Sequence, residues 1–267
     1  MTGVKTIRGE HPMYDTILIP TDGSEGAKAA ARHGVNLAAA FDSHVHFLSV
    51  VDERRYTGSI ADTDSVVRDQ RELFERQATG AVQTLEEIAT ETPVTCTTAV
   101  EHGVPYETIL SYANQHDIDL ITMGTHGRTG FDRFLVGSMT ERVVRTSTVP
   151  VLTSRRKPVE HTDYDRILIP TDGSEAATAA IDHGIAIAEQ YDATIHALSV
   201  VDSSALAGSY DIGVGPDIIE PWEEDCEQAV ADVTEKCENR GLNSITEVAQ
   251  GTPYREIRDY IDNEGLC

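Results

Sequence analysis

The feature that most constrains the fold of this chain is an internal repeat. Residues 14–52 align without gaps with residues 164–202, and about 24 of the aligned residues are identical. The similarity resumes between residues 101–119 and 249–267, where the offset between the two copies is two residues smaller. A chain of 267 residues is long enough for two domains, so we expect the same fold to occur twice.

Within the first copy, short apolar runs alternate with longer segments of helical pattern. The expected strands are 17–20, 45–51, 95–100, 119–124 and 149–153, and the expected helices are 24–40, 65–90, 105–116 and 138–146. Strict alternation of strands and helices predicts an α/β fold in which helices cover both faces of a parallel sheet.

The repeat also suggests domain boundaries. We expect a first domain over 14–153, a linker over 154–163 and a second domain over 164–267. The linker is polar and contains Pro158, and its three adjacent basic residues are interpreted as a solvated segment rather than a nucleic-acid patch. The second copy ends before the position of Asp119 is passed, so it is predicted to be incomplete, without the last two strands and the glycine-rich loop.

Composition narrows the classes of partner. The formal net charge is -24, from 45 acidic and 21 basic residues, which repels nucleic acids and anionic membranes. Scarce lysine with an excess of acid resembles proteins of a high-salt cytoplasm. No apolar run approaches the roughly 20 residues of a membrane span, and the first residues lack a signal-peptide pattern, so a cytoplasmic location is expected. The four cysteines have no spacing typical of a zinc site or a disulfide framework.

Asp22 is the first candidate site residue, because it directly follows the first expected strand. Its structural role would be to cap the next helix, with Glu25 completing a capping box. A binding role is compatible with this, because ligands of open α/β sheets bind beyond the carboxyl ends of the strands, where Gly124 also lies. Ser24 and Ser174 are interpreted as helix caps.

A second candidate is a glycine-rich stretch that ends at the last expected helix. It contains Gly124, Gly127, Gly137 and Ser138, and the helix begins at Ser138. Glycines let backbone amides approach an anion, and a helix N-terminus favours phosphate, so the stretch suits a polyphosphate. The alternative is that these glycines only turn a long loop. The pattern is neither a Walker A motif nor a dinucleotide fingerprint.

Three segments of the first copy resemble the universal stress protein family, in its ATP-binding branch. They are ILIPTDGSE, HFLSVVD and MGTHGRTGFDRFLVGSMTERVVRTSTVPVL, and the resemblance covers about 14–153. The family's spacing G-2x-G-9x-G-[S/T] is met by Gly124, Gly127, Gly137 and Ser138. The resemblance implies an open five-stranded parallel sheet of order 3-2-1-4-5, with Asp22 and Gly124 facing each other between strands one and four.

The resemblance also implies a nucleotide site. The backbone at Pro20, Thr21 and Val50 would hold adenine, and the Asp22 carboxylate would bond the ribose. The residues expected around the phosphates come from the glycine-rich stretch and are Met123, Gly124, Thr125, His126, Gly127, Arg128, Thr129, Gly130, Gly137, Ser138, Met139 and Thr140. A magnesium or manganese ion would accompany ATP, held mainly through phosphate and water, with no protein ligand assigned.

The expected function is a nucleotide-responsive regulatory module of the stress response, in a homo-oligomer whose protein partner is unknown. The alternatives are a slow ATPase or phosphotransferase and a nucleotide-free interaction protein. No residue is assigned to catalysis, since His126 suits a hydrogen-bonding role in the loop better than that of a general base. His44 and His46 lie on one face of the second strand and are interpreted as packing residues rather than a metal site. ATP, AMP and cyclic nucleotides stay open as ligands.

Overall fold

The structure, a computed structural model, describes residues 13–54, 64–125, 137–154, 164–202 and 216–266. The chain divides into two compact units, residues 1–162 and residues 163–267. They are called the first and second unit, and each is described by itself. The predicted linker lies almost entirely outside the described residues.

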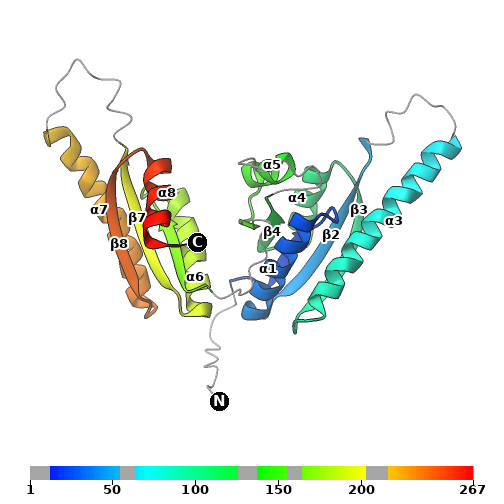
Figure 1. Cartoon of the computed structure of the whole chain (residues 1–267), viewed down its shortest axis with the longest axis horizontal. Helices are drawn as coiled ribbons and strands as arrows, with labels where there is room; N and C mark the ends of the chain where they lie inside the picture. Colours follow the sequence, from blue (N-terminus) through cyan, green and yellow to red (C-terminus); the bar gives the residue numbers. More distant parts are fainter. Residues whose placement is uncertain (1–12, 55–63, 126–136, 155–163, 203–215, 267) are drawn as a thin grey trace, which may run out of the picture. The chain divides into compact units, whose positions relative to one another are not determined.

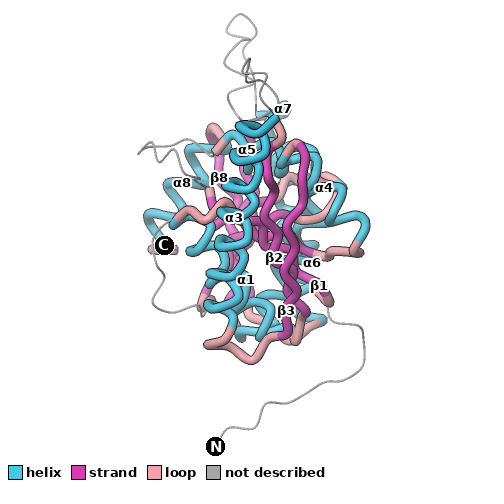
Figure 2. The backbone as a smooth tube through the Cα atoms, turned by 90° about the vertical axis from the view of Figure 1, so that its right-hand side faces the viewer, coloured by secondary structure: helices cyan, strands magenta, loops and turns pink. Residues whose placement is uncertain are grey.

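The first unit has a five-stranded parallel sheet in the order β3-β2-β1-β4-β5, which confirms the predicted strand order. Its strands are β1 (Thr16–Pro20), β2 (His44–Asp52), β3 (Thr95–Gly103), β4 (Leu120–Gly124) and β5 (Val151–Ser154). Figure 2 shows β2 and β3 running side by side. The observed ends lie within a few residues of the predicted ones.

Four helices among the described residues of the first unit cover the two faces of this sheet. They are α1 (Glu25–Phe41), α3 (Asp64–Ala89), α4 (Pro105–Gln115) and α5 (Ser138–Thr146). The helices α1 and α3 pack on one face, and α4 and α5 pack on the other (Figure 1). β1 is covered on both faces, so Ile17, Leu18 and Ile19 are fully buried, as expected of a central parallel strand.

The second unit repeats the start of this fold. Its strands β6 (Arg166–Pro170), β7 (Thr194–Asp202) and β8 (Ser244–Gly251) form a parallel sheet in the order β6-β7-β8. The helices are α6 (Glu175–Tyr191), α7 (Pro216–Asn239) and α8 (Pro253–Glu264). Within the described residues β6 pairs only with β7, so Ile167 and Leu168 are only half-buried where their counterparts in β1 are fully buried.

Candidate functional site

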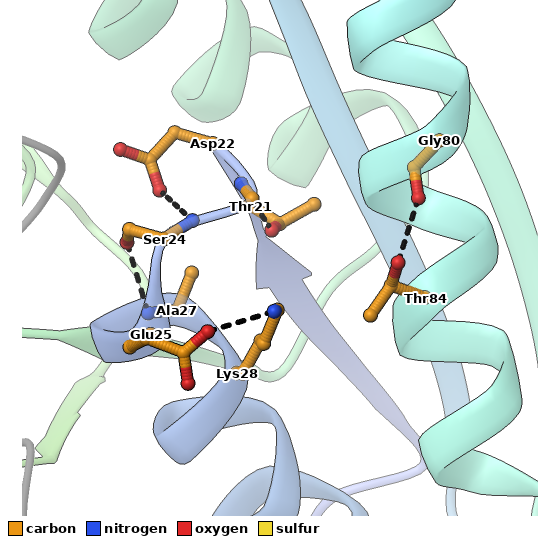
Figure 3. Close-up of polar contacts among 9 residues, drawn as sticks. Thr21, Asp22, Ser24, Glu25, Ala27, Lys28, Gly80 and Thr84 are labelled. Atoms are coloured by element: carbon orange, nitrogen blue, oxygen red, sulfur yellow. Dashed lines mark hydrogen bonds and ion pairs between the residues drawn. The ribbon is translucent and has the colours of Figure 1, made fainter.

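The connection from β1 to α1 forms one wall of the candidate site. The Ser24 hydroxyl caps α1 by accepting a hydrogen bond from the Ala27 amide at 3.2 Å, and Asp22 Oδ1 accepts one from the Ser24 amide at 3.0 Å (Figure 3). The prediction of a Ser24 cap is confirmed. The capping box of Asp22 and Glu25 is wrong, because the helix begins two residues later than that box requires; Glu25 instead pairs with Lys28 at 2.8 Å.

The carboxyl ends of β1 and β2 form the floor of the site. The Thr21 amide donates to the Leu48 carbonyl at 2.8 Å, and the buried Ser49 hydroxyl donates to the Thr21 carbonyl at 3.0 Å. These bonds fix the backbone of the turn before Asp22 against β2. Val50 therefore lies beyond the last pairing of β2 with β1, which ends at Pro20 and Leu48.

The end of β4 approaches α1 more closely than a side chain would allow. A Cβ atom at Gly124 would lie 2.5 Å from the Gly26 carbonyl oxygen, which is fixed backbone. Only glycine fits there. This first glycine of the predicted motif is therefore required by the packing of α1, whatever the loop binds.

The glycine-rich stretch leaves β4 and returns to α5 at neighbouring points. The Gly137 amide donates to the Thr125 carbonyl at 2.6 Å, and the Thr140 hydroxyl donates to the Gly124 carbonyl at 2.8 Å. No side chain of the described residues caps the start of α5. Its first-turn amides and its positive dipole end are therefore directed at the carboxyl end of the sheet, as an anion site requires.

These walls enclose a pocket of about 360 Å³ in the first unit, a size typical of small-molecule sites. It lies where the strand order reverses between β1 and β4, which is the usual ligand position in open α/β sheets. Its lining comes from seven elements and their ends: Pro20, Thr21, Asp22, Ser24, Ala27, Leu48, Ser49, Val50, Val51, Asp52, Phe74, Gln77, Ala78, Pro105, Ile109, Met123, Gly124, Gly137, Ser138, Met139 and Thr140.

Most of the predicted site residues line this pocket. They are Pro20, Thr21, Asp22, Val50, Met123, Gly124, Gly137, Ser138, Met139 and Thr140. Thr125 adjoins the pocket at the end of β4, where its amide donates to the Ser154 carbonyl at 2.9 Å. The other predicted residues, His126, Gly127, Arg128, Thr129 and Gly130, lie outside the described part of the chain.

Sequence reasoning missed the lining residues that come from α3 and α4. Phe74, Gln77 and Ala78 of α3 recur at helical spacing and face the pocket, as do Pro105 and Ile109 of α4. Their spacing in the sequence indicates one side of each helix, but it does not indicate which side meets the sheet end.

The described lining carries negative charge. It holds the carboxylates of Asp22 and Asp52 and no lysine or arginine. Arg54 binds Asp52 through Nε at 2.8 Å and Nη2 at 2.7 Å, and these hydrogen bonds, followed by the charge of Asp52, raise the pKa of the Arg54 guanidinium. An anion in this pocket would therefore depend on amide dipoles, on a bound cation or on the predicted loop residue Arg128.

The described residues contain no group of three or more His, Cys, Asp or Glu side chains arranged to hold a metal ion. Nor is any described helix both long and apolar enough to cross a membrane.

Comparisons with known proteins give consistent results. The sequence model of the Universal stress protein family matches residues 13–155 and 163–267. A universal stress protein of Methanocaldococcus jannaschii is 36% identical over 154 residues, which cover 58% of this chain and 89% of that protein. A second universal stress protein from the same organism is 32% identical over 157 residues, which cover 54% of this chain and 97% of that protein. The crystal structure of a universal stress protein from Archaeoglobus fulgidus has a TM-score of 0.70 over 94% of this chain and 84% of its own, at 17% identity, and so supports the fold alone.

Proposed function

The chain belongs to the universal stress protein family, and from this we propose that its first unit binds ATP in the pocket between β1 and β4. One observation carries the proposal: the strand ends expected to hold adenine and ribose line the same pocket as the start of α5, which no described side chain caps. Bound ATP would change the surface that the unit offers to a protein partner in the stress response. A homo-oligomeric state belongs to the same proposal.

In this arrangement each part of the nucleotide meets a different part of the pocket. Adenine lies against Pro20, Thr21 and the backbone of Val50, where β2 extends beyond β1. The ribose hydroxyls donate to the Asp22 carboxylate. The phosphates lie at the first turn of α5, with Ser138, Met139 and Thr140 supplying amides.

A divalent cation fits this lining. Because Asp22 adds negative charge to the pocket that holds the phosphates, magnesium or manganese would lower the repulsion, and the ion would be held through phosphate and water. We therefore expect ATP to bind much more weakly when EDTA removes the cation.

The test uses the duplicated aspartate. We expect Asp22→Ala to lower the affinity for ATP by about tenfold or more, since a hydrogen bond to a charged group contributes about 1.5–3 kcal/mol. Asp172→Ala is the matched control: Asp172 Oδ1 accepts from the Ser174 amide at 2.9 Å, as Asp22 Oδ1 does from Ser24 at 3.0 Å. Both variants thus lose the same turn contact, and only the first loses the ribose contact.

Isothermal titration with ATP and magnesium measures the difference. Adenosine should lose affinity for Asp22→Ala as well, because the proposed bond is to the ribose. Equal affinity of parent and Asp22→Ala for both ligands, or an equal loss in Asp172→Ala, would overturn the assignment.

A further inference from the structure

Three histidines and a tyrosine gather on the face of the first sheet that α4 covers. His44 and His46 are on β2, Tyr112 is on α4, and His116 follows α4. The ring centroid of His46 lies 5.1 Å from that of His44 and 5.4 Å from that of His116. The ring of Tyr112 stacks on that of His116, with centroids 4.0 Å apart. Tyr112 Oη and His46 Nδ1 are hydrogen-bonded at 2.9 Å.

The second unit keeps the histidine–tyrosine bond without the flanking histidines. His196 Nδ1 and Tyr260 Oη are hydrogen-bonded at 2.8 Å, at the positions of His46 and Tyr112. In the repeat, Thr194 occupies the position of His44, and Glu264 occupies that of His116. The bond is thus common to both copies, whereas the clustering of three histidines occurs in the first.

We propose that His44, His46 and His116 form an acid-sensitive contact between β2 and α4. In mildly acidic solution, protonation places like charges on rings that already contact one another, and their repulsion loosens α4 from the sheet.

The two outer rings meet hydroxyl groups or solvent. The two ring nitrogens of His44 contact the hydroxyls of Thr95 at 2.7 Å and Thr97 at 2.9 Å, and a hydroxyl oxygen can accept a hydrogen bond from a protonated ring. His116 is exposed to solvent. His46 is half-buried between them, and its ring takes up a proton against two neighbouring charges.

Two acidic groups near the cluster have identified interactions. Glu101 of β3 acts on the Tyr112 phenol, whose pKa is raised first by burial and then by this carboxylate. The Asp119 carboxylate, just before β4, accepts hydrogen bonds from the amides of Asp15 and Thr16 at the start of β1. In the second unit, burial lowers the pKa of His196; Glu264 opposes this shift, and Arg166 adds to it.

The direction of the pH effect follows from the folded environment of His46. Burial, then the charges of His44 and His116, lower the pKa of His46 from its ordinary 6.5. The unfolded chain therefore binds this proton more readily than the folded one. The stability contributed by a neutral His46 is present above about pH 6.5 and is lost as the pH falls through the lower, folded pKa.

The contact lies on the helix that lines the pocket. The C-terminal end of α4 contributes Tyr112 and is followed by His116, and its N-terminal part contributes Pro105 and Ile109 to the pocket. Loosening of the helix would therefore also move residues that line the pocket. The inference does not depend on which ligand the pocket binds.

The test replaces the outer histidines by the residues of the second copy. In the full chain, the double variant His44→Thr, His116→Glu keeps the His46–Tyr112 bond and removes both like charges. NMR titration of the histidine ring protons should show His46 titrating at higher pH in this variant than in the parent. Identical titration of His46 in both proteins would overturn the proposal.

Hydrogen exchange gives the second measurement. Between about pH 7.5 and 5.5, after correction for intrinsic rates, protection of α4 should fall by more than about threefold in the parent and by less than about threefold in the variant. α8 of the second unit serves as the internal reference and should behave alike in both. An equal loss of α4 protection in the variant would overturn the proposal even if the titration shifted.

Discussion

Gly34 and Gly184 occupy the same position in the two copies but meet different neighbours. A Cβ atom at Gly34 would lie 2.6 Å from Ile19 Cδ1 and 3.2 Å from Thr122 Cβ, so it would be held between β1 and β4. A Cβ atom at Gly184 would meet Ile169 Cδ1 at 2.7 Å, and its three nearest atoms all belong to β6. The same glycine is thus confined on two sides in the first unit and mainly on one in the second.

We expect Gly34→Ala to lower the free energy of unfolding of the first unit by about 1–3 kcal/mol, because a well-packed core resists an added methyl group. Gly184→Ala should change the second unit by less than about 1 kcal/mol, since the end of Ile169 can move and alanine is about 1 kcal/mol better than glycine within a helix. Urea unfolding, followed by far-UV circular dichroism and by the fluorescence of the single tryptophan, Trp222 in α7, separates the two units. Equal losses in both variants would contradict the argument.

At the scale of elements, the start of β1 is held by the turn before β4. Asp119 Oδ2 accepts hydrogen bonds from the amides of Asp15 and Thr16, both at 2.9 Å, and the Asp119 amide donates to the Thr16 carbonyl at 3.0 Å. One carboxylate thus satisfies two donors at the strand's first residues. It joins strands that are about 100 residues apart in the chain.

We expect Asp119→Ala to destabilise the first unit by about 1–3 kcal/mol, because two amides lose a charged acceptor and one of them is partly buried. Asp119→Asn keeps an acceptor oxygen in place and should lose less. Urea unfolding measures both losses, and hydrogen exchange at Thr16 locates them. Amide exchange at Thr16 should be faster in Asp119→Ala than in the parent. Unchanged exchange would show that the Asp119 carboxylate does not stabilise the start of β1.

The elements also show what sequence could and could not predict. Alternating apolar runs and helical segments predicted the five strands of the first sheet and the helices α1, α3, α4 and α5, because periodicity reflects which side chains are buried. The strand order came from family resemblance, because pairing between distant strands leaves no periodic signal. Helix residues such as Phe74 and Ile109 were missed at the site because their direction depends on tertiary packing. The Asp22 capping box failed because two nearby residues could each cap α1, and the backbone selected Ser24.

At the scale of the whole molecule, the two copies differ in how much of the sheet protects their matching parts. β1 is paired on both edges by β2 and β4, whereas β6 is paired by β7 within the described residues. A three-stranded sheet with fewer buried side chains gains less from apolar burial than a five-stranded one. We therefore expect the second unit to unfold at lower urea concentration than the first.

ATP should act on one of these transitions only, because every lining residue of the pocket belongs to the first unit. With magnesium and ATP at about one hundred times the dissociation constant, the free energy of unfolding of the first unit should rise by about 2.7 kcal/mol. The urea midpoint reported by Trp222 in the second unit should not change.

Native mass spectrometry should count one ATP per chain, although the ILIPTDGSE segment occurs twice, because the second unit has no described counterpart of α5 to hold phosphates. Two ATP per chain, or an equal shift of the Trp222 transition, would show that the second copy binds nucleotide as well.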